Sequence, residues 1–176
     1  MIDLPMAELR GRVLVSRERV KFADADPYGH LASGAYVDMI LSHRVEVLDD
    51  LLGFSILRVA RGGVVYPART IEVSYLAPAF VGEMLEVGSW VEEMRQQSFA
   101  MRAVVVGAAD RAVRALANIH FVAVDASSGK PVQIPATLPS SAKSNPIPGL
   151  PRFTEYARTI TGLPDRWLQP LVRAEA

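Results

Sequence analysis

The chain has 176 residues, half of them hydrophobic, with 19 basic and 19 acidic residues and a formal net charge of zero. This length fits one domain with a substantial core. The neutral balance, without a cluster of basic residues, excludes the usual electrostatic surface of a nucleic-acid-binding protein. Because the sequence has no cysteine, disulfides, thiol catalysis and thiolate metal sites are excluded as well.

The amino end and the hydrophobic runs indicate a protein that stays in solution. Residues 1–5 include an aspartate and a proline where a signal peptide would need a basic start and an apolar core. No apolar run reaches the ~18 residues needed to span a bilayer. We therefore expect a cytoplasmic protein that does not bind membranes.

The predicted elements are one strand, one long helix and four further strands. The first strand covers about residues 13–22. Apolar residues then recur at spacings of three and four from 35 to 52, which predicts a helix. Alternating apolar and polar residues predict strands at 64–76, 84–94, 98–106 and 112–124. The short connections between these strands predict antiparallel hairpins.

A helix that is apolar around most of its circumference needs a surface wrapped about it. Five strands with alternating faces can supply a curved antiparallel sheet, so we expect an α+β fold. Exposed sheet edges are commonly covered by pairing, which predicts a homo-oligomer, either a dimer or a dimer of dimers. Residues 1–135 should form the domain, and 136–176 a C-terminal extension with a proline-rich linker and a short helix.

The most informative segment is the loop between the first strand and the helix, residues 22–31. It carries Asp24, Asp26 and His30 on a turn that contains Pro27 and Gly29. Two carboxylates and an imidazole thus precede a helix N-terminus, whose free N–H groups can stabilise a developing negative charge. This arrangement suits chemistry on a carbonyl group.

Four features together resemble a known family. They are the Asp24-x-Asp26-Pro27-x-Gly29 loop with His30, Tyr36 in the first helical turn, the Arg95-Gln96-Gln97-Ser98-Phe99 strand junction and the Val132-Gln133-Ile134-Pro135 strand end. Over roughly residues 14–138 the chain resembles the hotdog-fold acyl-CoA thioesterases, in particular the 4-hydroxybenzoyl-CoA thioesterase-like group. The resemblance implies a hotdog fold, in which a curved five-stranded antiparallel sheet wraps a long central helix.

The resemblance also implies a reaction, the hydrolysis of an acyl-CoA thioester to a free carboxylic acid and CoA. It makes Asp26 the catalytic carboxylate, as nucleophile or as general base. It makes the backbone amide of Ser33 the oxyanion donor and leaves His30 to orient the carbonyl. It assigns the CoA phosphates to Arg95 and Ser98. No cofactor is implied, since CoA is part of the substrate.

Two positions depart from the family pattern, and two other functions fit the residues. Leu31-Ala32-Ser33 stands where many relatives have asparagines, and Gln96 stands where close relatives have an arginine. A non-catalytic acyl-CoA-binding module would have the same shape. A hydratase or dehydratase of enoyl or 3-hydroxyacyl thioesters is the other alternative, although such enzymes space their Asp and His differently.

Several of these polar side chains also have structural interpretations. Asp24 is expected to cap the turn, and His30 is as consistent with packing as with a role in the site. His43 is expected on a polar face of the helix, and His120 is expected to face solvent or an interface. With three histidines and no further cluster of ligands, we expect no metal site.

Overall fold

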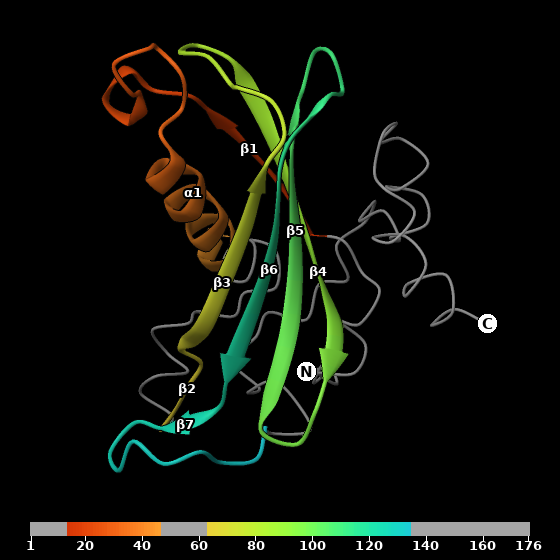
Figure 1. Cartoon of the computed structure of the whole chain (residues 1–176). Coiled ribbons are helices and arrows are strands. Elements are labelled where there is room, and N and C mark those ends of the chain that lie inside the picture. The colour runs from red at the N-terminus through yellow and green to blue at the C-terminus, as the bar shows by residue number, and fades with distance from the viewer. Residues whose placement is uncertain (1–13, 47–62, 135–176) are drawn as a thin grey trace, which may run out of the picture.

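The computed structural model describes residues 14–46 and 63–134. In this part of the chain, helix α1 (Ser33–Glu46) lies against one face of a five-stranded antiparallel sheet, as Figure 1 shows. The strands of this sheet, in the order β1-β4-β5-β6-β3, are β1 (Leu14–Arg19), β4 (Met84–Met94), β5 (Ser98–Gly107), β6 (Val113–Val122) and β3 (Ala68–Tyr75). A two-stranded sheet pairs β2 (Val64–Val65) with β7 (Val124–Asp125). The predicted α+β fold is confirmed.

Some element boundaries differ from the sequence prediction. The predicted strand at 64–76 is two strands, because Pro67 between them has no N–H to donate to a sheet ladder. The first strand ends at Arg19, and Phe22–Asp24 forms one turn of 3₁₀ helix. The helix begins at Ser33 rather than at residue 35. The remainder of the predicted helix and the extension at 136–176 lie outside the described residues.

The helix contacts the sheet along one stripe of its surface. Tyr36, Ile40 and His43 are buried at spacings of four and three residues, which places them on one side of the helix. Val45, by contrast, is 41% exposed. The helix therefore buries one face against the strands of its own chain and keeps a partly apolar face at the surface. No helix in the described ranges is long and apolar enough to cross a membrane.

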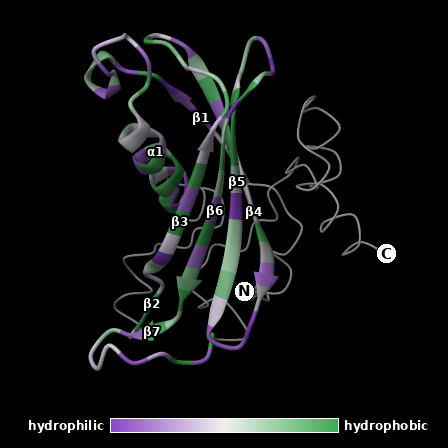
Figure 2. Cartoon of the chain, viewed as in Figure 1, coloured by the Kyte–Doolittle hydropathy of each residue, from purple (hydrophilic) through white to green (hydrophobic). Residues whose placement is uncertain are grey.

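The central strand β5 is buried on both of its faces. Met101, Ala103 and Val105 belong to the core that includes the helix residues Tyr36 and Ile40. Val104 and Val106 on the other face of the strand are also fully buried. Figure 2 shows this strand as mostly hydrophobic along its length. A strand buried on both faces reads as a nearly continuous apolar run, as the segment 103–106 does.

His43 is a core residue, which corrects the prediction that it lies on a polar helix face. Its side chain has no exposed surface. Its Nδ1 is hydrogen-bonded to Ser16 Oγ on β1 at 2.7 Å, and its Nε2 to Ser89 Oγ on β4 at 2.8 Å. Burial lowers the pKa of His43 to about 4, because no charge compensates for loss of water around the imidazolium. A neutral imidazole thus joins the helix to two strands.

An ion-pair cluster braces the end of the sheet where β5 and β6 meet. Arg114 donates through Nε and Nη2 to Glu83 Oε1, at 3.0 and 2.7 Å, and through Nη2 to Asp110 Oδ2 at 2.6 Å. A Cβ added at Gly107 would lie 2.7 Å from Arg114 Nη2 and 2.9 Å from Glu83 Oε1. The absence of a side chain at Gly107 therefore makes room for the cluster.

The state of His43 predicts how stability depends on pH. The folded pKa of about 4 lies below the unfolded value near 6.5, so the unfolded chain takes up a proton first as the pH falls. This contribution to stability is complete above pH 6.5 and decreases towards pH 4, by roughly 3 kcal/mol in all. Chemical denaturation at several pH values should show this loss. It should be absent in His43→Gln and retained in His120→Gln, the exposed control; equal pH profiles for wild type and His43→Gln would contradict the prediction.

Two glycine substitutions should differ in their effect on stability. Gly107→Ala should reduce the free energy of unfolding by about 1–3 kcal/mol, because the new methyl group displaces the Arg114 cluster. Gly34→Ala in the first turn of α1 should be neutral or stabilising by up to about 1 kcal/mol, since its Cβ would meet nothing within 4 Å. Urea denaturation of both variants measures the difference. A Gly107→Ala variant as stable as Gly34→Ala would show that the cluster does not need this space.

Candidate functional site

The carboxylate of Asp26 holds together the turn that carries it. Its Oδ1 accepts hydrogen bonds from the backbone N–H of Tyr28 at 2.9 Å and of His30 at 3.0 Å. Gly29, at φ +78°, also donates its N–H to the carbonyl of Asp26 at 3.0 Å. Within the described residues Oδ2 of Asp26 makes no hydrogen bond. One carboxylate oxygen therefore anchors the turn, and the other is available.

The expected role of Asp24 as the capping residue of this turn is wrong. The side chain of Asp26 performs that function, as the two bonds to its Oδ1 show. Asp24 ends the 3₁₀ turn, and its backbone carbonyl accepts the N–H of Ala32 at 2.9 Å. That bond closes the loop directly before α1. Asp24 thus contributes its main chain to the loop, and its side chain makes no hydrogen bond within the described ranges.

The loop is attached to the segment between β3 and β4. Leu31, which is buried, donates its N–H to the carbonyl of Ala79 at 2.8 Å. His30 forms a β-bridge with Phe80, and their rings meet edge to face with centroids 5.1 Å apart. The backbone N–H of Asp26 donates to the carbonyl of His30 at 2.7 Å. These contacts hold Asp26 and His30 in fixed positions relative to the sheet.

Helix α1 begins immediately after this loop, at Ser33. The first N–H groups of a helix have no partner within it, and they carry the positive end of the helix dipole. In the described part of the chain, the N–H groups of Ser33, Gly34 and Ala35 make no hydrogen bond. The first one that does is that of Tyr36, which donates to the carbonyl of Ala32 at 3.2 Å. Three backbone donors are thus available in the first turn of α1, beside the Asp26 loop.

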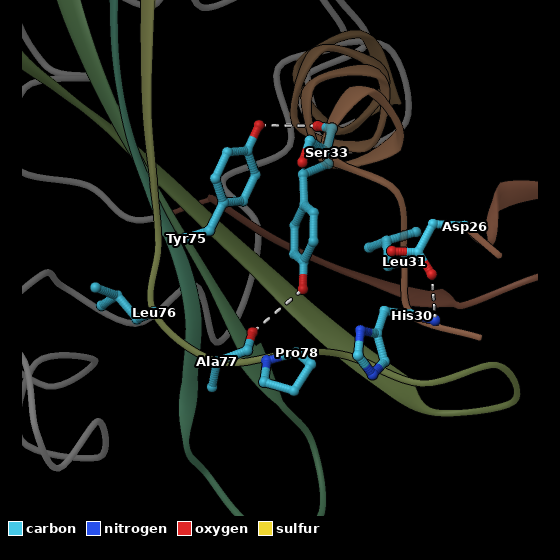
Figure 3. Close-up of a pocket in the computed structure, with 9 residues that line it drawn as sticks. Asp26, His30, Leu31, Ser33, Tyr75, Leu76, Ala77 and Pro78 are labelled. Carbon is cyan, nitrogen blue, oxygen red and sulfur yellow. Dashed lines mark hydrogen bonds between the residues drawn. The ribbon is translucent and has the colours of Figure 1, made fainter. Parts of the chain in front are cut away.

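A cavity of about 310 Å³ joins these groups. Its lining residues come from the loop, from α1 and from the end of β3 with the segment that follows it. They are Asp26, His30, Leu31, Ser33, Tyr36, Tyr75, Leu76, Ala77 and Pro78. Figure 3 shows Asp26 and His30 on one side, Tyr75 on the opposite side, and Ser33 at the start of the helix between them. The structure therefore brings together Asp26, His30 and Ser33, three of the predicted site residues.

Two tyrosines form the aromatic wall of the cavity. Tyr36 is buried and donates its hydroxyl to the carbonyl of Ala77 at 3.5 Å. Burial raises the pKa of the Tyr36 phenol, so it remains a neutral donor. Tyr75 meets Tyr36 edge to face, with ring centroids 5.4 Å apart. Sequence reasoning noted Tyr36 only as part of a motif and missed Tyr75, whose sole signal was its place at the end of a strand.

Arg95 and Ser98 lie far from this cavity within one chain. They close the turn between β4 and β5, where the N–H of Arg95 donates to the carbonyl of Ser98 at 2.8 Å. That turn is at the opposite end of the sheet from the start of α1, as Figure 1 shows. Arg95 pairs its Nε with Glu93 Oε1 at 2.8 Å. The predicted CoA-binding pair is thus not part of the cavity formed by a single chain.

The described residues offer little to a metal ion. They contain no group of three or more His, Cys, Asp or Glu side chains that could coordinate one. His43 is enclosed between two serines, and His120 is exposed, as predicted. Asp26 and His30 are the lining side chains suited to acid–base chemistry, and α1 adds backbone N–H donors.

Comparisons with solved structures agree with the fold. The 1,4-dihydroxy-2-naphthoyl-CoA thioesterase of Synechocystis superposes with a TM-score of 0.65 at 17% identity, over 86% of this chain and 97% of that one. The DHNA-CoA thioesterase of Staphylococcus aureus superposes with a TM-score of 0.63 at 18% identity, over 69% of this chain and 80% of that one. A probable thioesterase of Bartonella henselae superposes with a TM-score of 0.64 at 21% identity, over 70% of this chain and 99% of that one. These structures share the hotdog fold with this chain.

Comparison of the sequence with family models identifies the family of this chain. A search of curated proteins finds no match to the chain. A family model described as the thioesterase-like superfamily matches residues 20–141, which include the Asp26 loop, α1 and four of the five strands of the main sheet; β1 ends just before the match begins. The chain therefore belongs to the thioesterase-like superfamily.

Proposed function

We propose that this chain is an acyl-CoA thioesterase that hydrolyses its substrate to a free carboxylic acid and CoA. The observation that carries the proposal is that the Asp26 carboxylate and the start of α1 at Ser33 line the same cavity. A thioester carbonyl between them would have an attacking oxygen or base on one side and an N–H donor on the other. The family, whose structural relatives include named CoA thioesterases, supports this reaction class.

Asp26 can bring about hydrolysis of the thioester by either of two routes, as a nucleophile or as a general base. In the first, a carboxylate oxygen attacks the carbonyl carbon, the C–S bond breaks, and CoA leaves as a thiolate that takes a proton from water. A second water then hydrolyses the mixed anhydride. In the second, Asp26 takes a proton from water as that water attacks the carbonyl, and the proton passes to the leaving sulfur. Either role falls to Oδ2, because Oδ1 already accepts two N–H groups.

Ser33 and His30 would support the carbonyl during this step. As the carbon becomes tetrahedral, its oxygen becomes negative, and a preorganised N–H donor stabilises that charge. The N–H of Ser33 suits this role, because it has no partner in the described structure and stands at the positive end of the helix dipole. The ring of His30 lines the same cavity, packed against Phe80, where it would orient the thioester.

A homodimer would bring the proposed CoA-binding residues to the cavity. Strand β3 is an edge of the sheet, and Ile71, Tyr75 and Leu76 at this edge are exposed in the single chain. Antiparallel pairing of β3 with its copy across a two-fold axis turns the partner end for end. The partner's turn between β4 and β5 would then lie at the cavity end of this chain. Arg95 and Ser98 would contact the phosphates of CoA bound at the other subunit's cavity.

The Asp26→Asn variant tests the proposed reaction. Asparagine keeps a side-chain oxygen that can accept the N–H groups of Tyr28 and His30, so the turn should survive while the nucleophile or base is lost. Thiol release from a panel of acyl-CoAs should fall by about 10²–10⁴-fold, with thermal stability unchanged. Asp24→Asn in the same loop is the matched control and should keep wild-type turnover. Wild-type protein that binds acyl-CoA without releasing thiol would instead identify a binding module.

Two substitutions at Ser33 separate its amide from its hydroxyl. Ser33→Ala keeps the N–H and should change kcat by no more than about threefold, within the range of a lost weak contact. Ser33→Pro removes the N–H at the first helical position, which proline tolerates, and should lower kcat by about 10²–10³-fold. Circular dichroism checks that α1 is retained. An alanine variant as impaired as the proline variant would assign the function to the hydroxyl and contradict the amide role.

A further inference from the structure

Tyr75 makes a hydrogen bond that the proposed mechanism has not used. It is the last residue of β3, and it donates its phenolic hydroxyl to the backbone carbonyl of Ser33 at 2.9 Å, marked in Figure 3. The acceptor belongs to the first residue of α1. The bond therefore links the edge strand of the sheet to the helix start, across residues 42 positions apart in the sequence.

The peptide group that receives this bond is the one that presents a free N–H. The carbonyl of Ser33 and the N–H of Gly34 belong to the same planar peptide unit, so a bond to one restrains the direction of the other. The N–H of Ser33 is on the other side of the same Cα atom. A hydrogen bond to the carbonyl also polarises the unit and strengthens its N–H as a donor.

Within the described residues, two side-chain hydrogen bonds link the first turn of α1 to the end of β3 and the segment after it. The bonds from His43 to Ser16 and Ser89 hold the helix to the sheet about three turns further along. Gly34 has no side chain, and a Cβ there would touch nothing within 4 Å, so packing does not fix the first turn at this position. The hydroxyl of Tyr36 reaches the carbonyl of Ala77 only at 3.5 Å. The bond from Tyr75 is the shorter of these two links.

We infer that Tyr75 is a positioning residue for the oxyanion donors. Its hydroxyl holds the Ser33–Gly34 peptide group, and with it the direction of the N–H groups at the start of α1, while its ring packs edge to face on Tyr36. Its catalytic consequence rests on the proposed thioesterase function. Its structural consequence, a restrained first turn of α1, holds independently of that function.

The Tyr75→Phe variant removes the hydroxyl and keeps the aromatic ring. Thiol release should show kcat lowered about tenfold with KM within about twofold of wild type, since the donors act on the transition state. Tyr66→Phe is the matched control, because Tyr66 packs its ring on Phe99 near β2 and has no hydroxyl bond within the described residues. It should keep wild-type kcat.

Two further measurements distinguish a positioning role from a general loss of stability. Amide hydrogen exchange by NMR should be about tenfold faster in Tyr75→Phe at Tyr36 and Val37, the first amides of α1 with hydrogen-bond partners, and unchanged in β5. In the Ser33→Pro background, Tyr75→Phe should lower kcat by less than it does in wild type, because one of the donors at the helix start, the N–H of residue 33, is already absent.

The outcomes separate this inference from the proposed function. If wild type releases no thiol from any acyl-CoA, the proposed function is wrong, and the exchange experiment still decides whether Tyr75 restrains the helix start. Unchanged exchange at Tyr36 and Val37 in Tyr75→Phe overturns the inference. An active wild type with a Tyr75→Phe variant that alters only KM also overturns it, since Tyr75 would then contact the substrate directly.

Discussion

The site depends on the pair of hydrogen bonds that Oδ1 of Asp26 accepts from the N–H groups of Tyr28 and His30. They make a single carboxylate both the anchor of its turn and a reactive group with one oxygen available. A charge-assisted bond of this kind is stronger than a neutral one, and two of them restrict the rotation of the side chain. Because the same turn leads directly into α1, fixing the carboxylate also fixes its distance from the helix N-terminus. The same two hydrogen bonds thus fix the position of the Asp26 carboxylate and leave one of its oxygens available for reaction.

The rest of the fold holds the walls of the cavity at that distance. The bond from Leu31 to Ala79 attaches the loop to the segment after β3, and the bond from Tyr75 to Ser33 attaches the helix start to the end of β3. Further along, His43 joins α1 to β1 and β4. The turn at Arg95 and Ser98 lies at the opposite end of the sheet, which makes pairing of β3 with a second copy the economical way to complete a CoA site.

Much of the fold could be predicted from the sequence, because the signals are local. Alternation along the strands and helical spacing before residue 46 depend on neighbours in the chain, and so does the turn chemistry of Asp26, Pro27 and Gly29. The resemblance to the thioesterase family, carried in part by this motif, implied that Asp26, His30 and Ser33 belong to one site. The sequence could not show whether Asp24 or Asp26 caps the turn, because that depends on the backbone angles that direct two N–H groups towards one oxygen.

What the sequence could not indicate were partners that are distant along the chain. His43 looked like a surface residue because its hydrogen-bonding serines are 27 and 46 positions away. In the sequence Tyr75 resembles any aromatic residue in a strand, because the acceptor of its hydroxyl, the carbonyl of Ser33, is 42 positions away. The space left by Gly107 for Arg114 is likewise a consequence of three elements meeting. Such contacts arise from packing, which periodicity does not encode.

The most direct test of Asp26 as the reacting group is a crystal structure with a thioether analogue of an acyl-CoA, which keeps the carbonyl and cannot be hydrolysed. The carbonyl carbon should lie about 3–3.5 Å from Oδ2 of Asp26, or be bridged to it by one water. The carbonyl oxygen should lie within hydrogen-bond distance of the N–H of Ser33. An analogue bound with its carbonyl outside the cavity, or with Oδ2 turned away from it, would contradict the proposed chemistry.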